Sequence, residues 1–146
     1  MKLPAKGELD LDQSIDFLHQ LIQFEGRPPV LIMTGGDVMK KQHLPEIMEQ
    51  ARSLKIPFAL SPAVTGLRND GAFELVRNSG ASSISISLDG RKDFHDFIRG
   101  TGVFDSTLKI LGLREDIGVS MQVNTLVSSD NIKDLPLVLR ILLDLG

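Results

Sequence analysis

Short apolar runs alternate along this chain with longer segments in which apolar residues recur every three or four positions. The runs have the length and composition of buried strands, and they lie at residues 30–33, 58–60, 83–88 and 119–125. Gly, Asp and Asn are common in the segments that follow them, as expected of turns at strand ends. The pattern therefore predicts four strands.

The segments between and around these runs have the spacing of amphipathic helices, and five of these six helices are long. They lie at residues 12–26, 43–54, 69–80, 94–98, 105–117 and 134–146. Asp12, Asp105 and Asp134 stand at helix starts, where an aspartate side chain can cap the first turn, and Gly26 stands at the first helix end. Helices that alternate with strands in this way predict an α/β fold with a parallel sheet and right-handed crossovers.

Polar residues occupy one face of each of the last two strands. In residues 83–88 serines alternate with Ile and Leu, and in residues 119–125 Gln122 and Asn124 alternate with Val and Met. A doubly wound sheet carries helices on both faces, and each amide left unsatisfied beneath a helix costs about 1–3 kcal/mol. The inner face of a barrel can instead be polar around a ligand cavity. We therefore favour a partial barrel, and an ordinary core in which these side chains bond one another is the alternative.

Composition and charge narrow the range of functions. The 146 residues contain no cysteine, which excludes disulfides, zinc–thiolate sites, cysteine nucleophiles and thiolate-bound iron–sulfur clusters within this chain. The three histidines are far apart in the sequence, so we expect no metal site. A net charge of −3 argues against a nucleic-acid partner. Because the chain shows neither a signal-peptide pattern nor an apolar run of membrane-spanning length, we expect a cytoplasmic protein without a membrane partner.

Candidate binding residues follow the first strand. Gly35 and Gly36 allow the backbone to approach a ligand closely, and Asp37 supplies a carboxylate for an ammonium group. A tight turn between strand and helix also explains the glycine pair. The segment is not a Walker loop, because no Lys-Ser/Thr pair follows, and it lacks the glycine spacing of a dinucleotide site.

Further candidates stand after the third and fourth strands. Ser87 and Asp89 end the third strand, where barrels and other α/β enzymes place their ligands, although Asp89 followed by Gly90 also suits a capped turn. Arg99 supplies a cation for a ligand carboxylate, and Asn124 supplies an amide for ribose hydroxyls or for a neighbouring turn. All of these residues fall at one end of the expected sheet, which favours a small polar ligand there.

Several short motifs occur in a fixed order along the chain. They are Thr34-Gly35-Gly36-Asp37, Ser85-Ile86-Ser87-Leu88-Asp89-Gly90, His95-Asp96-x-x-Arg99-Gly100, Phe104-Asp105-x-Thr107-Leu108 and Val123-Asn124-Thr125. As an ordered set they resemble the core of radical S-adenosylmethionine (SAM) enzymes, particularly those with a SPASM-type extension, over nearly the whole chain. The resemblance implies one incomplete core domain over residues 1–146, built as a partial (βα)6 TIM-like barrel without its first and last units.

The resemblance also implies a site for SAM at the C-terminal ends of the strands. Its residues would be Gly35, Gly36, Asp37, Ser87, Asp89, Arg99 and Asn124. The glycines and Asp37 match a Gly-Gly-Glu motif that holds the amino group of SAM, with an acid one methylene shorter. Ser87 and Asp89 would lie near the ribose or the carboxylate. Arg99 would pair with the carboxylate, and Asn124 would contact the ribose.

One feature of the family is missing. In radical SAM enzymes a Cys-x-x-x-Cys-x-x-Cys loop binds a [4Fe–4S] cluster that cleaves SAM to a 5′-deoxyadenosyl radical, and this chain has no cysteine. We therefore interpret the chain as an internal fragment of a radical SAM iron–sulfur oxidoreductase that binds SAM and does not cleave it alone. Four strands would leave open sheet edges, so we also expect self-association or modest stability.

Two other functions stay open. A non-catalytic SAM-binding or protein-interaction module would keep the strand-end residues and dispense with the redox centre. A flavodoxin-like regulatory domain would also place its site at strand ends. Such domains, however, use a cluster of acidic residues together with a lysine, and Asp37 and Asp89 are not part of such a cluster. The polar strand faces also disfavour a sheet covered by helices on both sides.

Overall fold

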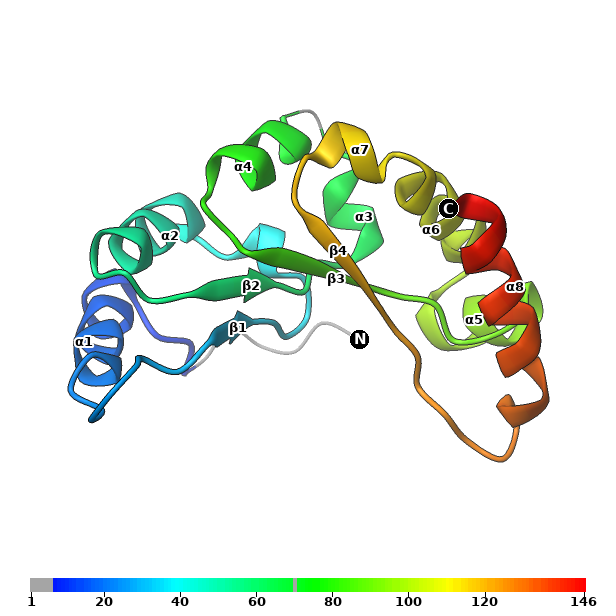
Figure 1. The fold of residues 1–146 in the computed structure, drawn as a ribbon, viewed down its shortest axis with the longest axis horizontal. Helices are drawn as coiled ribbons and strands as arrows, with labels where there is room; N and C mark the ends of the chain where they lie inside the picture. The colour runs from blue at the N-terminus through cyan, green and yellow to red at the C-terminus, as the bar shows by residue number, and fades with distance from the viewer. Residues whose placement is uncertain (1–6, 70) are drawn as a thin grey trace.

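The computed structural model describes residues 7–69 and 71–146, which form an α/β fold around one parallel sheet (Figure 1). The strands are β1 (Leu31–Met33), β2 (Phe58–Leu60), β3 (Ser83–Ser87) and β4 (Ser120–Asn124). They are hydrogen bonded in the order β1-β2-β3-β4, each parallel to the next. The four predicted strands and their parallel arrangement are confirmed, with some strand ends shorter than expected.

Helices fill the connections between the strands. In the described residues they are α1 (Leu11–Leu21), α2 (Leu44–Ser53), α3 (Val64–Leu67), α4 (Ala72–Asn78), α5 (Lys92–Arg99), α6 (Val103–Gly112), α7 (Arg114–Ile117) and α8 (Leu135–Leu145), with 3-10 turns at Val38–Lys40 and Ile132–Asp134. The one-turn helix α3 was not predicted. The helix predicted over residues 105–117 is divided into α6 and α7, because Leu113 between them leaves helical geometry (φ −97°, ψ 17°).

The first helix begins and ends earlier than predicted. Asp10, not Asp12, is its N-cap: the Asp10 carboxylate accepts the Gln13 N–H at 2.8 Å, and the Gln13 side chain accepts the Asp10 N–H at 3.1 Å. This reciprocal capping box satisfies two backbone donors at once, which a cap at Asp12 would not do. The helix ends at Leu21, well before Gly26.

Asp105 does not cap a helix, because the helix in which it lies begins two residues before it, at Val103. The first backbone N–H groups of α6 are satisfied from α5 instead. The Asp96 carboxylate accepts the Gly102 N–H at 3.1 Å and the Phe104 N–H at 2.7 Å. A residue of the preceding helix therefore does what was predicted of Asp105, and the same contacts lower the pKa of Asp96.

Two other predicted helix starts also differ from the structure. Asp134 stands before α8 as expected, but its side chain caps nothing there and accepts the Arg91 N–H at 3.1 Å. α4 begins at Ala72 with Gly71 as its N-cap, three residues after the start predicted at residue 69. Asp70 lies outside the described residues.

Helices pack on one face of the sheet, along the outer side of the arc in Figure 1. The side chains on that face are apolar, and Phe58, Leu60, Ile84 and Ile86 are at most 2% exposed. Neighbouring helices contact one another along the arc, with α1 against α2 and α4 against α7. The hydrophobic core therefore lies between the sheet and this single layer of helices.

The opposite face of the sheet is polar on β3 and β4, whereas Ile32 of β1 and Ala59 of β2 are apolar residues on the same face. The parallel register pairs Ser85 with Gln122 and Ser87 with Asn124, so these four side chains share that face. Gln122 and Asn124 are exposed, which confirms that they do not lie beneath helices. The described strands form an open sheet with β1 and β4 at its two edges.

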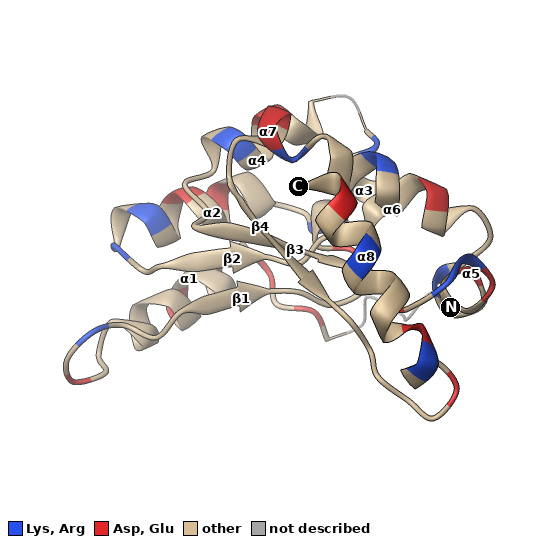
Figure 2. Ribbon diagram, turned by 45° about the vertical axis from the view of Figure 1, so that its right-hand side comes forward, with Lys and Arg blue, Asp and Glu red and all other residues tan. Residues whose placement is uncertain are grey.

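Charged residues lie on the helices and loops, with basic and acidic side chains interspersed (Figure 2). None of the four strands contains Lys, Arg, Asp or Glu. Any charge at the ends of the strands must therefore come from the loops and helices that follow them. Within residues 7–69 and 71–146, no helix has the length and apolar character needed to cross a membrane.

Candidate functional site

A cavity of about 270 Å³ lies at the C-terminal ends of β1, β2 and β3. Its wall consists of residues at or just after the ends of these strands, together with side chains of α5 and α6. Of the predicted site residues, Gly35, Gly36, Ser87 and Arg99 line it. Parallel α/β folds bind ligands at this end of the sheet, so the cavity is the candidate functional site.

The loop after β1 depends on glycine for its backbone conformation. Gly35 has φ 99° and Gly36 has φ 48°, in the region that side chains other than glycine rarely adopt. A Cβ added at either position would meet no atom within 4 Å. Glycine is therefore favoured at these positions by the backbone angles, and not because a side chain would clash with neighbouring atoms. The loop backbone stays open to the cavity.

Asp37 turns away from the cavity and joins this loop to the segment before α3. Its Oδ1 accepts the N–H groups of Met39 and Ala63, both at 3.3 Å. Its Oδ2 is buried and has no hydrogen-bond partner among the described residues, since the Lys40 ammonium is 3.6 Å away and its side chain is 73% exposed. A Cβ at Gly66 would lie 2.5 Å from Oδ1, so the carboxylate occupies the space that glycine leaves there.

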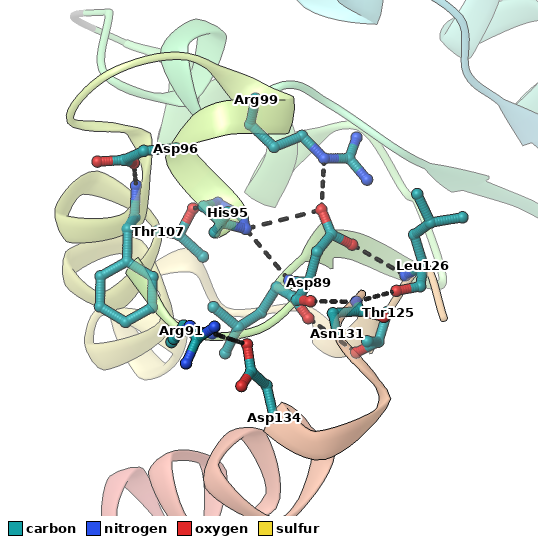
Figure 3. A network of polar contacts seen from close by, with 12 residues as sticks. Asp89, Arg91, His95, Asp96, Arg99, Thr107, Thr125, Leu126, Asn131 and Asp134 are labelled. Atoms are coloured by element: carbon teal, nitrogen blue, oxygen red, sulfur yellow. Dashed lines mark hydrogen bonds and ion pairs between the residues drawn. The ribbon is translucent and has the colours of Figure 1, made fainter. Parts of the chain in front are cut away.

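Asp89 is fully buried at the end of β3 and does not line the cavity. One of its carboxylate oxygens accepts the Nε–H of Arg99 at 2.6 Å, and the other accepts the Leu126 N–H at 2.9 Å (Figure 3). The Arg99 side chain is 39% exposed and extends from the last turn of α5 to the cavity. The positive charge at the site is therefore anchored by a buried negative charge behind it.

His95, which the sequence reasoning did not choose as a site residue, also lines the cavity. Its Nδ1 lies 3.1 Å from the backbone nitrogen of Asp89, which can only donate, so the ring proton is on Nε2, 3.3 Å from the Thr107 hydroxyl. Burial lowers the pKa of His95 more than the Asp89 carboxylate raises it, which leaves the ring neutral at pH 7. A neutral ring makes no ion pair with Asp89 Oδ2, although Nδ1 is only 3.6 Å from it.

The loop after β4 is held against the end of β3. The Thr125 hydroxyl donates to the Leu88 carbonyl at 2.8 Å, and the amide of Asn131 donates to the carbonyls of Asp89 and Leu126. Asn131 is fully buried. Its position in a polar Ser-Ser-Asp-Asn stretch suggests only an exposed loop, so no local pattern predicts this contact.

The structure brings some predicted site residues together and separates others. Asp37 and Asp89 lie behind the cavity wall, and Asn124 lies on the open face of β4, where it accepts a hydrogen bond from the Gln122 side chain at 2.8 Å. Its register partner Ser87 does line the cavity. The missed residue His95 stands four positions before Arg99, a helical spacing that places both side chains on one face of α5.

The residues of this chain do not fit an iron–sulfur cluster. The sequence contains no cysteine. Among the described residues, no group of three or more His, Asp or Glu side chains is placed to hold a metal ion.

Comparison with known proteins identifies the class. No protein-family model matches the chain. Curated proteins that are similar to nearly its whole length show that the chain belongs to the radical SAM superfamily, as its ordered motifs predicted.

The individual relatives are named as synthases of hemes and of a related compound. The chain is 32% identical over 131 residues to the AdoMet-dependent heme synthase of Oleidesulfovibrio alaskensis, which covers 88% of this chain and 33% of that protein. It is 26% identical over 138 residues to the Fe-coproporphyrin III synthase of Methanosarcina barkeri, covering 94% and 34%. It is 28% identical over 141 residues to the pre-heme d1 synthase of Dinoroseobacter shibae, covering 96% and 34%. The chain spans about a third of the length of these relatives.

Proposed function

We propose that this chain is the SAM-binding part of a radical SAM oxidoreductase, with SAM held at the C-terminal ends of its strands. The observation that carries the proposal is the cavity in which the Gly35-Gly36 loop, Ser87 and Arg99 meet. In this proposal the open sheet is part of a (βα)6 TIM-like barrel, and its polar face is turned toward the interior of that barrel.

The charged groups of SAM match the charges beside the cavity. Arg99 presents a guanidinium, which suits the carboxylate of SAM. Asp37 Oδ2 is a buried carboxylate oxygen without a hydrogen-bond partner in the described residues, a state that costs about 1–3 kcal/mol. The ammonium group of SAM would satisfy it after a small movement of Asp37, whose neighbour Ala63 lines the cavity.

The rest of SAM would extend onto the open face of the sheet. The cavity volume of about 270 Å³ is slightly below the usual range of roughly 300–1,000 Å³ for small-molecule sites. Ser87 on β3 lines the cavity, and Asn124, its register partner on β4, is exposed beside it. We propose that Asn124 contacts the ribose there.

The intact family also uses a [4Fe–4S] cluster, which supplies the electron for SAM cleavage when it is bound. The residues of this chain do not fit that cluster, since no thiolate is present. We therefore propose that the chain binds SAM and does not cleave it alone. The names of the relatives support a role for the intact protein in tetrapyrrole synthesis.

A non-catalytic SAM-binding module is the second candidate, and the absence of cysteine favours it. It would use the same cavity. We also propose self-association through the sheet edges, because Val30, just before the edge strand β1, is 61% exposed and Ile32, within it, is 59% exposed. Sedimentation velocity at rising concentration tests this, and a monomer at every concentration would contradict it.

Isothermal titration calorimetry with SAM tests the proposed function. We expect saturable binding to the wild-type chain and affinity about tenfold lower for Arg99→Gln, since a charge-assisted hydrogen bond contributes roughly 1.5–3 kcal/mol. Arg140→Gln is the matched control, because Arg140 is an exposed arginine on α8, outside the cavity. No binding heat for the wild type at millimolar SAM would overturn the proposal.

A further inference from the structure

The carboxylate of Asp89 is not accessible to a ligand. The residue is 0% exposed, and its two oxygens accept hydrogen bonds from Arg99 Nε at 2.6 Å and from the Leu126 N–H at 2.9 Å. Because the residue is fully buried and does not line the cavity, a ligand could contact the carboxylate only if the groups around it moved. The role that the family resemblance implies for Asp89, close to the ribose or carboxylate of SAM, therefore does not agree with its surroundings.

The contact with Asp89 sets the direction of Arg99. The carboxylate holds the guanidinium at Nε, and the two terminal nitrogens of Arg99 make no hydrogen bond to any described residue (Figure 3). Arg99 lines the cavity, so these nitrogens are the groups available to a ligand there. A guanidinium in this position can offer its N–H groups as a fork to a carboxylate.

The other neighbours of Asp89 leave this arrangement undisturbed. His95 is neutral, because its Nδ1 accepts the Asp89 N–H, and so it does not compete with Arg99 for the carboxylate. Asn131 binds the Asp89 carbonyl and keeps the backbone in place. In the part of the chain that the structure describes, Arg99 is therefore the cation that balances the buried charge of Asp89.

An arginine side chain without such a partner would be mobile at 39% exposure and would have to become ordered when a ligand binds. Asp89 keeps the side chain ordered before binding, which lowers the entropy cost of complex formation. We propose that Asp89 is a positioning residue that fixes Arg99 for the carboxylate of SAM and does not itself contact SAM. This inference rests on the proposed function.

A double-mutant cycle tests the inference. SAM binding is measured by calorimetry for the wild type, Asp89→Asn, Arg99→Gln and the double variant. Each single variant is expected to lower SAM affinity about tenfold, and the double variant is expected to be no weaker than Arg99→Gln. The second ligand is 5′-methylthioadenosine, which lacks the carboxylate, and its affinity is expected to be equal for all four proteins. Asn at position 89 can still accept the Leu126 N–H, and circular dichroism checks the fold.

A measurement on the wild type covers the case in which Asp89→Asn does not fold. The Nε–H resonance of Arg99, assigned by its absence from Arg99→Gln, is expected to exchange slowly with water before any ligand is added. Rapid exchange, like that of an exposed arginine, would overturn the inference.

The outcomes separate the inference from the proposed function. No binding of SAM to the wild type would overturn both. SAM binding that Asp89→Asn leaves unchanged would overturn only the positioning role. Additive losses in the double variant, or an equal loss of 5′-methylthioadenosine affinity in Asp89→Asn, would show that Asp89 acts on the ligand without Arg99.

Discussion

The loop after β3 and the loop after β1 both reach the cavity, but they differ in how their carboxylates are satisfied. Asp89 after β3 has hydrogen-bond donors on both oxygens, one of them the guanidinium of Arg99. Asp37 after β1 has donors on Oδ1 only, and no described residue lies within hydrogen-bond distance of its buried Oδ2. The carboxylate at the end of β3 therefore has a hydrogen-bond donor on each oxygen, whereas at the end of β1 Oδ2 has only the ammonium of the exposed Lys40 nearby, at 3.6 Å.

This difference has a physical consequence for binding. A site whose polar groups are already paired is preorganised, and it loses stability when one partner is removed. A buried oxygen without a partner costs stability in the free protein and can regain it when a ligand binds. Loss of Arg99 at the β3 end is therefore expected to lower the free energy of unfolding strongly. Substitution of Asp37 at the β1 end is expected to change that free energy little and to weaken ligand binding.

The largest effect is expected from Arg99→Ala at the β3 end. It leaves the fully buried Asp89 carboxylate with the Leu126 N–H as its remaining partner. We expect the free energy of unfolding to fall by about 3 kcal/mol, the low end for breaking a buried ion pair, since solvent partly screens Arg99. Urea unfolding measures this. Arg140→Ala is the control and should change stability by less than about 0.5 kcal/mol; equal losses in both variants would contradict the account.

Gly66→Ala tests the packing of Asp37 at the β1 end. A methyl group there would lie 2.5 Å from Oδ1 and 2.7 Å from Oδ2 of Asp37, so the carboxylate must move. We expect a loss of about 1–3 kcal/mol, as for overpacking in a core. In Gly112→Ala the added methyl meets no atom within 4 Å, so this control should be neutral or slightly stabilising. The account fails if Asp37→Ala does not relieve the cost of Gly66→Ala.

The pH dependence of stability tests His95. Burial lowers its pKa in the folded protein below the ordinary value of 6.5, so the unfolded chain binds more protons in that range. The contribution of His95 is then constant above pH 6.5, and stability declines as the pH falls from 6.5 toward the lowered pKa. Thermal unfolding between pH 8 and pH 5 measures the decline. His95→Gln should flatten it and His43→Gln should not; an unchanged slope in His95→Gln would show that other groups cause it.

The smallest effect on stability is expected from Asp37→Asn. The Asn side chain can still accept the Ala63 N–H, and the variant removes a buried carboxylate oxygen that no described residue satisfies. We expect a change within about 0.5 kcal/mol in the free energy of unfolding, together with weaker SAM binding. A large loss of stability with unchanged SAM affinity would mean that Asp37 is structural only.

The sequence predicted those parts of the fold and site that depend on local pattern. The alternation of apolar and polar residues located the third and fourth strands and predicted that Gln122 and Asn124 lie on a face without helices. Strand ends located Gly35, Gly36 and Ser87, which line the cavity. These features follow from residues that are close together in the chain.

The remaining features depend on contacts between distant segments. Asp37 turns inward because the N–H of Ala63 and the space at Gly66 receive it, and neither lies near it in sequence. Asp89 is buried because Arg99 and Leu126 meet there. The sequence of a single segment does not predict these contacts between segments. The N-cap of a helix is also hard to predict where several aspartates stand close together, as at the start of α1.

The most direct test of the central claim is a chemical-shift map of the isotope-labelled chain titrated with SAM. The account predicts saturable shifts centred on Gly35, Gly36, Ser87 and the Arg99 side chain, with the amides of α8 unchanged. Shifts that are absent at saturating SAM, or that centre on residues outside the cavity, would contradict it.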